Sequence, residues 1–386
     1  MRIGINALFM IPGVVGGSET ILRNLISQLV AIDPHNEYIL FTNRENSGSF
    51  NLDQPNFLEV RCPIPARFRP ARTLWEQFIL PIQCQRRRID LLHSPGYICP
   101  VALPCPSVVS ILDMNYFFFP QDWSKLALWT LRILVPLSAR RSCEIIALSQ
   151  SSKRHIMKAL KISEDKINVT YMGVDKIFHP RHNYHQILEL KKRMGIKGNF
   201  ILSVANSHPH KNLRRLVQAY YILRRDEGIT HQLVLAGNPG RDHLELLKMV
   251  KKLGVAQKVV FTEYVPHHQM PLIYQAADLF VFPSLYEGFG LPILESMACG
   301  TPVVSSNAAS LPEIVGTAGV LVDPHDVNEM AGAMYRVLSD KSLAQDLIKK
   351  GLKQSKRFSW VQTAKETLAI YKKAMTGRKN SKKKVS

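Results

Sequence analysis

The sequence has few cysteines, no long apolar run and little negative charge, and each shortage excludes a class of protein. The six cysteines among 386 residues show no C-x-x-C spacing, so a zinc site or disulfide framework is not expected and a reduced cytosolic compartment fits best. No apolar run approaches the ~20 residues of a membrane-spanning helix. The N-terminus, MRIGINALFMIPGVVGG, lacks the regions of a signal peptide and is typical of a strand followed by a glycine loop.

The shortage of acidic residues leaves a strong positive balance. Lys and Arg number 50 against 30 Asp and Glu, a formal charge of +20, which indicates anionic partners such as phosphates, nucleic acid or an acidic membrane face. Arginines crowd residues 61–88 among aromatic and aliphatic side chains, a pattern that fits the interface of an anionic membrane or, alternatively, a solvated surface. These arginines are Arg61, Arg67, Arg69, Arg72, Arg86, Arg87 and Arg88. The basic segment 377–386 is expected to be a disordered tail.

Short segments rich in Val, Ile and Leu alternate with helical patterns along the whole chain. Their nearly continuous apolar character is typical of parallel strands covered by helices on both faces. The fold class predicted is therefore α/β, with two tandem Rossmann-like, doubly wound parallel-sheet domains. The expected strands are 2–7, 37–42, 107–112, 144–149, 166–171, 200–206, 231–237, 258–263, 279–284, 301–306 and 319–323.

The order of strands and helices indicates where a ligand would bind. Right-handed crossovers place all the loops that follow strands at one edge of each sheet, and open α/β sheets bind ligands at that edge. The loops after strands 2–7, 107–112, 200–206 and 279–284 are the places to search. The periodic pattern stops around residues 172–180 (MGVDKIFHP), which indicates a linker between the domains.

The stretch PSLYEGFGLPILESMACG places two carboxylates around a glycine turn. Pro292 suits the first turn of a helix, so the backbone amides before it are expected to form an anion-binding site at the helix start. Glu295 lies one helical turn further on, where a carboxylate accepts hydrogen bonds from a diol such as ribose, and Glu287 precedes the turn. The arrangement suits a nucleotide sugar; an ordinary strand-to-helix turn with surface glutamates is the alternative. The amides are those around Gly290, Leu291 and Ile293, with Gly288 and Gly290 allowing close approach of a phosphate.

This stretch, followed by SLPEIVGTAGVLVDPHD, resembles the signature of the retaining glycosyltransferase family 4 (glycosyl transferases group 1), which has the GT-B fold. The E-x7-E motif of that family corresponds to Glu287 and Glu295. The resemblance spans nearly the whole chain, and the HKNL form is similar to mannosyltransferase-like branches. The other similar segments are GGSE, ALSQSSK, GVDKIFHP, HKNL, YVPHHQMPLIYQAAD and RFSWVQTAKETLAIY.

The resemblance implies an organisation and an activity. Residues 1–175 would form an acceptor-binding domain, 176–357 a nucleotide-sugar-binding domain, with a cleft between them, and 358–376 a helix returning to the first domain. The expected reaction is retaining transfer of a sugar from GDP-mannose or a UDP-sugar to a glycan or lipid-linked glycan, in cell-surface polysaccharide, lipopolysaccharide or glycolipid biosynthesis. The expected location is cytoplasmic, peripheral on the cytoplasmic face of the membrane.

The resemblance also implies roles for single residues. Glu295 would bind the ribose, Glu287 the transferred sugar, and Lys211 the leaving diphosphate. Asp113 is an acceptor-side helper or a turn cap. No cofactor is implied, and no metal, since cationic side chains and helix dipoles would supply the positive charge; no D-x-D motif is present, and His267-His268 is interpreted as a polar loop. Further donor-binding residues are His210, Asn212, Gly288, Phe289, Gly290 and Leu291, with Gly16 and Gly17 approaching the diphosphate from the N-terminal domain.

Three positions depart from the family pattern and keep alternatives open. Leu112 replaces a common His, His210 a common Arg, and Met172 a common Asn. Histidine carries little charge near neutral pH, so one diphosphate cation is titratable or missing. The alternatives are a GT-B relative with other chemistry, such as a nucleotide-sugar epimerase or phosphorylase, and a weak or inactive nucleotide-sugar-binding protein. A nucleic-acid-binding protein is disfavoured because no known reading motif is present.

Overall fold

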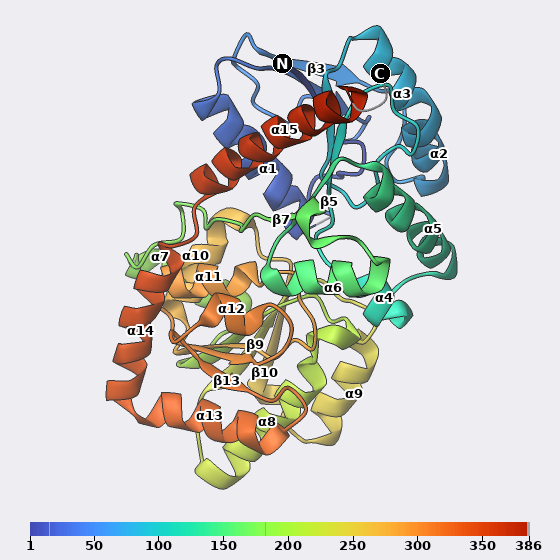
Figure 1. Ribbon diagram of the computed structural model, residues 1–386. Coiled ribbons are helices and arrows are strands. Elements are labelled where there is room, and N and C mark those ends of the chain that lie inside the picture. Colours follow the sequence, from blue (N-terminus) through green and yellow to red (C-terminus); the bar gives the residue numbers. More distant parts are fainter. Residues whose placement is uncertain (15, 182, 384–386) are drawn as a thin grey trace. The chain divides into compact units, whose positions relative to one another are not determined.

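The chain folds into two compact units. In the computed structural model, residues 1–14, 16–181 and 183–383 are described, the last seven by their backbone alone. The N-terminal unit comprises Met1–Gly173 with Ser359–Ser386, and the C-terminal unit comprises Val174–Phe358. Each unit is a parallel sheet with helices packed on it (Figure 1). The backbone of the last helix continues through residue 383, within the segment expected to be a disordered tail, and residues 384–386 lie outside the described residues.

The N-terminal unit has a seven-stranded sheet in the order β3-β2-β1-β4-β5-β6-β7, with parallel pairing throughout. The chain moves outward from β1 in one direction and from β4 in the other, so the strand order reverses between these two strands. That reversal is the switch point at which doubly wound sheets bind ligands. The strands are β1 (Arg2–Asn6), β2 (Glu37–Thr42), β3 (Phe57–Arg61), β4 (Leu91–Ser94), β5 (Ser107–Ser110), β6 (Glu144–Ala147) and β7 (Ile167–Val169).

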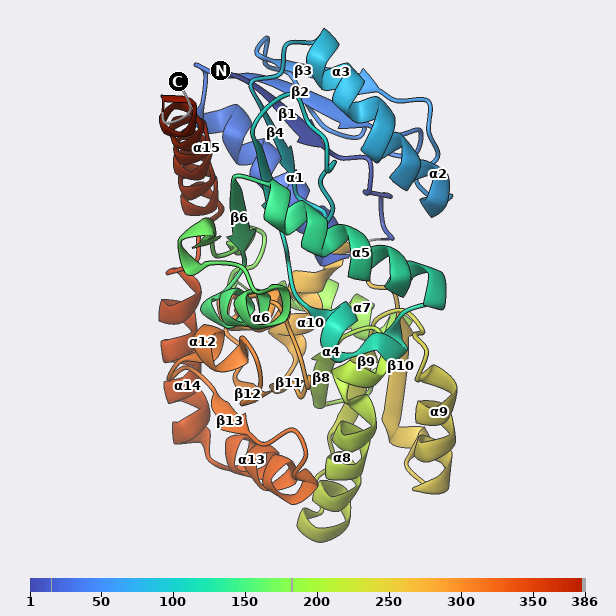
Figure 2. The same ribbon diagram turned by 45° about the vertical axis from the view of Figure 1, so that its right-hand side comes forward.

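Helices from both ends of the sequence complete the core of the N-terminal unit. Figures 1 and 2 show α15 beside α1, and Ile370 and Tyr371 of α15 are buried in the same apolar cluster as the β1 strand. The Tyr371 hydroxyl lies 2.7 Å from Nδ1 of buried His93 on β4. The helices are α1 (Gly17–Ile32), α2 (Arg69–Leu74), the π-helical turn η1 (Trp75–Ile79), α3 (Leu80–Arg86), α4 (Asn115–Phe118), η2 (Pro120–Asp122), α5 (Lys125–Arg141), α6 (Gln150–Leu160), η3 (Glu164–Lys166) and α15 (Trp360–Lys383).

The C-terminal unit repeats the same plan with six strands, in the order β10-β9-β8-β11-β12-β13, so its order reverses between β8 and β11. Its strands are β8 (Phe200–Val204), β9 (Gln232–Ala236), β10 (Val259–Glu263), β11 (Leu279–Phe282), β12 (Val303–Ser306) and β13 (Val320–Val322). Its helices are α7 (Tyr184–Met194), η4 (Pro209–Lys211), α8 (Leu213–Glu227), α9 (His243–Lys252), η5 (Ala256–Lys258), η6 (His267–Gln269), α10 (Met270–Ala276), α11 (Leu291–Ala298), α12 (Leu311–Val315), α13 (Val327–Ser339) and α14 (Lys341–Ser355).

The predicted fold class is confirmed, and every expected strand is present, although several end one or two residues earlier than expected. Two strands of the N-terminal unit, β3 and β4, were not predicted. Strand β3 is at the sheet edge and exposes Leu58, and β4 has only four residues, one of them the buried His93. Neither segment has the continuous apolar character on which the prediction rested. No helix within the described residues combines the length and apolar character needed to cross a bilayer.

Candidate active site

Two loops of the C-terminal unit meet where its strand order reverses. Lys211 lies in the loop after β8 and Glu287 in the loop after β11, and β8 and β11 are neighbours in the sheet. The Lys211 Nζ atom lies 2.6 Å from Glu287 Oε1, and both side chains are largely buried. The Lys211 ammonium also lies 5.7 Å from the centre of the Phe282 ring. The structure therefore brings together two residues that the sequence placed in separate ligand-binding loops.

Asn212 and His210 fix the loop that carries Lys211. Asn212 adopts a left-handed backbone conformation, with φ at 60°. Its side-chain amide donates to the carbonyls of Pro283, at 3.0 Å, and Pro324, at 2.7 Å. The amide of Leu285 donates to the carbonyl of buried His210 at 2.7 Å. Both residues hold the two loops in register, and their predicted contacts with a donor stay predictions.

The glycine turn before α11 is tightly built. Gly290 has a φ of 116°, and a β-carbon there would lie 2.8 Å from Leu311 Cδ2, so both conformation and space require glycine. The Ser310 hydroxyl lies 3.0 Å from the Glu287 carbonyl and 2.7 Å from that of Phe289. Because the first amides of a helix lack acceptors within it, the start of α11 from Leu291 offers donors to an anion.

One detail of the predicted anion-binding site is wrong. The Ile293 amide donates to the Gly290 carbonyl at 3.0 Å, so it closes the first turn and is not available to a ligand. Pro292 stands in the first turn, as predicted. The amide of Leu291 stays the predicted donor at the helix start.

Glu295 is buried on α11 instead of lying on an open face. Its side chain accepts a hydrogen bond from the Tyr274 hydroxyl of α10, at 2.9 Å from Oε2. Burial raises the pKa of the Glu295 carboxyl from 4.5 to about 7, although the Tyr274 hydrogen bond and the charge of His267 oppose the rise. The carboxyl therefore changes its charge near neutral pH.

The sequence analysis missed the residues that surround Glu295. His267 does not form a merely polar loop: its Nε2 lies 3.6 Å from Asp175 Oδ2, and its ring packs edge-on against Phe178. This contact with Asp175 raises the pKa of His267 and lowers that of Asp175. The signal for Tyr274 was its place on an apolar helical face, because a buried tyrosine needs a partner for its hydroxyl.

The remaining predicted residues belong to the N-terminal unit. Gly16 has a φ of 57° and precedes α1, which begins at Gly17. Leu112 is buried, and Asp113 Oδ1 accepts a hydrogen bond from the Asn115 amide at 2.9 Å, as a turn cap does. The cap was one of the two roles open for Asp113, and the acceptor-side role stays a prediction.

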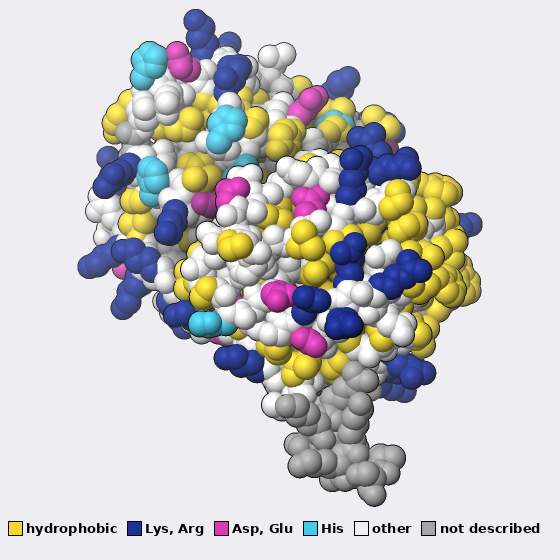
Figure 3. Space-filling view, turned by 90° about the horizontal axis from the view of Figure 1, so that it is seen from above, with side chains coloured by type: hydrophobic (Ala, Val, Ile, Leu, Met, Phe, Trp, Pro, Cys, Tyr) yellow, Lys and Arg dark blue, Asp and Glu magenta, His cyan; other side chains and the backbone are white. Residues whose placement is uncertain are grey.

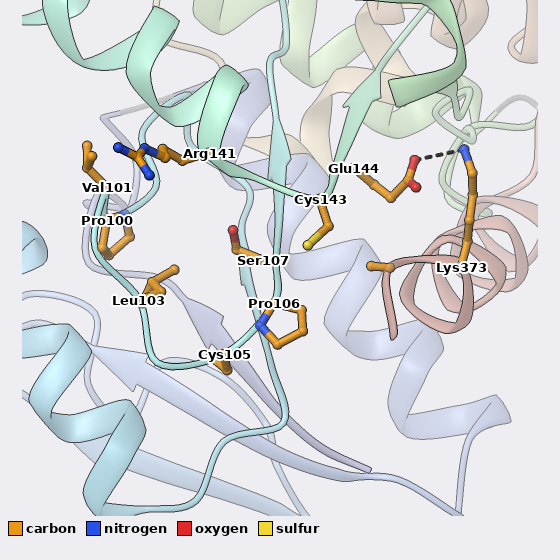
Figure 4. A pocket seen from close by; sticks show the side chains of 11 residues that line it. Pro100, Val101, Leu103, Cys105, Pro106, Ser107, Arg141, Cys143, Glu144 and Lys373 are labelled. Carbon is orange, nitrogen blue, oxygen red and sulfur yellow. Dashed lines mark hydrogen bonds and ion pairs between the residues drawn. The ribbon is translucent and has the colours of Figure 1, made fainter. Parts of the chain in front are cut away.

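Two cavities lie at opposite edges of the two sheets. In the C-terminal unit, a cavity of about 160 Å³ lies at the carboxyl ends of β8, β9 and β10, lined by residues that include Asn206, Asn238 and Met270. In the N-terminal unit, a cavity of about 500 Å³ lies at the amino-terminal edge, before β5 and β6, with Arg141 on one side and the Glu144–Lys373 pair on the other (Figure 4). The first of these cavities lies near Glu295, because Met270 in its wall stands one turn before Tyr274, which bonds to Glu295.

Known proteins resemble this chain in sequence and architecture. Residues 185–354 match the model of Glycosyl transferases group 1, and residues 15–176 match that of Glycosyltransferase Family 4. The chain is 32% identical over 282 residues to O-antigen chain mannosyltransferase B of Escherichia coli, a match covering 73% of this chain and 74% of that protein. The chain belongs to glycosyltransferase family 4.

A further relative and two solved structures are also similar to this chain, the structures in fold. The family 4 chain is 33% identical over 58% of its length to a serotype-specific mannosyltransferase WbdA of E. coli, of which the match covers 28%. Its fold matches sucrose-phosphate synthase of Thermosynechococcus elongatus with a TM-score of 0.77 at 20% identity, over 98% of this chain and 100% of that one. Anabaena Alr3699/HepE in complex with UDP-glucose matches with a TM-score of 0.75 at 20% identity, over 97% and 100%. The predicted GT-B fold and glycosyltransferase class are confirmed.

Proposed function

We propose that this glycosyltransferase moves a hexose from a nucleotide-diphosphate sugar to a glycan or lipid-linked glycan, with retention at the anomeric carbon, in the synthesis of cell-surface polysaccharide or glycolipid. The observation that carries the proposal is the Lys211–Glu287 pair, at 2.6 Å, beside the glycine turn that opens α11. A cation and a helix start suit a diphosphate, and a carboxylate beside them suits sugar hydroxyls.

The parts of the donor fit the order of the groups in the C-terminal unit. The base would occupy the cavity at the ends of β8, β9 and β10, and the ribose would bind Glu295 next to it. The diphosphate would lie between Lys211 and the amides at Gly290 and Leu291, and Glu287 would face the sugar. In the structure the Lys211 ammonium pairs with Glu287, so donor binding requires it to share its hydrogen bonds between carboxylate and phosphate.

The chemistry needs stabilisation of a leaving group more than a nucleophile. The bond between the anomeric carbon and the phosphate oxygen breaks, and the acceptor oxygen bonds to the same face of that carbon. The acceptor proton passes to the leaving diphosphate. Lys211 and the start of α11 stabilise the charge that develops on the diphosphate, the task a metal ion performs in other transferases.

Relatives support mannose as the transferred sugar. Several matching proteins are mannosyltransferases, among them the MMP alpha-(1->4)-mannosyltransferase of Mycolicibacterium hassiacum, 32% identical over 61% of this chain and 56% of that protein. GDP-mannose is therefore the first donor to test, and UDP-glucose, which occupies a structural neighbour, is the second.

A panel of nucleotide sugars in a thermal-shift assay tests the proposal. We expect GDP-mannose to raise the melting temperature more than UDP-sugars or free sugars do. With glycan acceptors, NMR of the product should show the anomeric configuration of the donor. No shift with any nucleotide sugar, or an inverted product, would contradict the proposal.

We also propose that the enzyme works on an anionic membrane surface through the N-terminal unit. The segment 61–88 folds into α2, η1 and α3, and Leu74, Phe78 and Ile82 recur every fourth residue and are exposed. Helix α5 adds a second exposed row, Leu126, Trp129 and Ile133, that the sequence analysis did not single out. We call these six residues the apolar ridges.

Two observations favour a membrane as the partner of the apolar ridges. The ridges belong to neighbouring helices, because Gln77 and Ser138 each bond to the loop before β5, at Val101 and Cys99. Figure 3 shows hydrophobic side chains gathered at the right, the side of α2, α3 and α5 in Figure 1, with Lys and Arg beside them. Exposed basic residues around the ridges include Arg67, Arg69, Arg86, Lys125 and Arg132. Apolar side chains in a basic border suit anionic lipid.

Sedimentation with vesicles tests the membrane proposal. We expect anionic vesicles to bring down more protein than neutral ones at low salt, with a salt-resistant remainder from insertion of the ridges. Replacing Trp129 and Phe78 together by Ser should remove that remainder and leave the salt-sensitive part. Equal sedimentation with neutral and anionic vesicles at low salt would contradict it and would favour a soluble glycan as acceptor.

A further inference from the structure

The carboxylate predicted to bind the ribose is held by a single buried hydroxyl. Tyr274 of α10 is fully buried, and its hydroxyl donates to Glu295 Oε2 at 2.9 Å. Glu295 itself is only 9% exposed, so its carboxylate has little freedom to rotate within α11. The hydrogen bond occupies one carboxylate oxygen and leaves Oε1 to accept from a ligand.

Packing fixes the position of the Tyr274 hydroxyl. The Tyr274 ring meets Phe178 and Phe280 edge-on, at centroid distances of 6.0 and 5.4 Å. Its backbone carbonyl accepts a hydrogen bond from the Thr301 hydroxyl at 2.6 Å. Ring and backbone are thus both anchored, and the hydroxyl stands at a set point next to α11. This arrangement exceeds what packing alone requires, because a phenylalanine would fill the same space.

We propose that Tyr274 is a positioning residue for donor binding: its hydroxyl aims the Glu295 carboxylate at the ribose diol of the nucleotide sugar. The proposal rests on the proposed function, in which Glu295 binds the ribose. Tyr274 itself touches no part of the donor. Its hydroxyl keeps one oxygen of the Glu295 carboxylate engaged, so that the other oxygen faces both ribose hydroxyls. The same hydrogen bond favours the ionised form of Glu295, which accepts hydrogen bonds from those hydroxyls.

The charges around Glu295 give this role a measurable pH dependence. The groups that face it are Tyr274 on α10, the His267–Asp175 pair beside η6, and Cys299 one turn further along α11. Burial holds the pKa of Glu295 at about 7, and the Tyr274 hydrogen bond and the His267 charge keep it from rising further. Since the ionised carboxylate accepts from the diol, donor affinity should increase as the pH rises through about 7.

The test is the donor affinity of the full chain and of Tyr274→Phe between about pH 6 and about pH 8.5, with GDP-mannose and UDP-glucose as probes. Their diphosphates carry no group that titrates in this range. Loss of the hydroxyl should weaken affinity about tenfold at neutral pH and move the midpoint of the pH profile upward by about one unit. The loss should shrink at high pH, and kcat at saturating donor should stay unchanged while KM increases.

Tyr220→Phe is the matched control. Tyr220 lies on α8 and is also buried in the C-terminal unit. Its hydroxyl donates to the His231 carbonyl at 2.7 Å and not to Glu295. We expect it to leave the pH profile in place. The proposal is overturned if the pH profile of donor affinity has the same midpoint in Tyr274→Phe as in the wild type. This holds both when affinity falls equally at every pH and when it does not fall. Glu295→Gln distinguishes failure of this proposal from failure of the proposed function. Unchanged donor affinity in that variant would refute the binding of the ribose by Glu295.

Discussion

The two sheets share a strand order but differ in what their switch points contain. In the N-terminal unit, Asn6 at the end of β1 donates to Ser94 at the end of β4, at 3.5 Å, and the Phe9 ring lies against Gly96 so closely that a β-carbon there would be 2.5 Å from it. In the C-terminal unit, the corresponding loops present the Lys211–Glu287 pair beside an open helix start.

In doubly wound folds the topology sets where a ligand binds, and the loops that follow the strands set which ligand it is. The first switch point is filled by the Asn6 amide, the Ser94 hydroxyl and the Phe9 ring, and it also holds the buried carboxyl of Glu76, which bonds to Asn6 and lies 3.8 Å from Arg72. The second switch point carries the opposite charges of Lys211 and Glu287 in two adjacent loops, and this pair suits a donor that is part phosphate and part sugar. Substitutions that remove the Lys211–Glu287 pair should therefore act mainly on use of the donor.

The largest effect is expected for Lys211→Ala. Loss of the charge opposite the leaving diphosphate should lower turnover about 100-fold or more, with the fold intact. Steady-state kinetics with saturating donor measures it. Lys248→Ala is the control, since Lys248 is an exposed lysine of the same unit paired with Glu245. Near-normal turnover in the Lys211 variant would refute its role.

Glu295→Ala should act on binding before it acts on chemistry. Loss of hydrogen bonds from a ribose diol to a carboxylate should weaken nucleotide affinity on the order of 10- to 100-fold. Calorimetric titration with GDP and UDP measures the change, and a melting curve checks the fold. An unchanged affinity would mean that the ribose lies elsewhere.

Membrane binding can be compared between the two units with triple substitutions that each remove three positive charges. Replacing Arg86, Arg87 and Arg88 by Gln should weaken binding to anionic vesicles on the order of 100-fold at low salt, because three basic residues near the surface contribute about 1 kcal/mol each. Replacing Lys349, Lys350 and Lys353 of α14 by Gln removes the same charge from an exposed helix of the C-terminal unit. Equal losses for both triples would show that net charge, not the N-terminal surface, drives binding.

The smallest effect is expected for His210→Arg. An added cation near the diphosphate site should raise activity about two- to fivefold near neutral pH, if the arginine fits where the histidine is buried. Steady-state kinetics measures the gain, and its absence would indicate that another cation fills the position.

Much of the fold followed from apolar periodicity because most strands are buried on both faces. The two strands that were not predicted are β3, an edge strand with an exposed leucine, and β4, a four-residue strand with a buried histidine. Histidine in a core depends on tertiary partners, here Tyr371 and Ser110. Those partners are distant from His93 in the sequence, so no local pattern predicts them.

The candidate site was predictable where its residues belong to one motif or follow a strand. Glu287, Glu295 and Lys211 were found in this way, although not that Lys211 and Glu287 touch. Tyr274 and the His267–Asp175 pair were missed because their importance arises from burial and from contacts between separate segments. The burial of Glu295 was missed for the same reason, and with it the pKa near 7.

The return of the chain to the N-terminal unit has a consequence for synthesis on the ribosome. Gly173 leaves this unit against the start of α15, where a β-carbon would lie 2.1 Å from the Trp360 amide nitrogen, and Thr363 donates to the Tyr171 carbonyl at 2.6 Å. The core of the N-terminal unit therefore lacks Ile370 and Tyr371 until the whole C-terminal unit and most of α15 have been translated. The C-terminal unit is continuous in sequence and can complete its own core earlier. The half that is made first must finish folding last, contrary to the usual order for domains in a nascent chain.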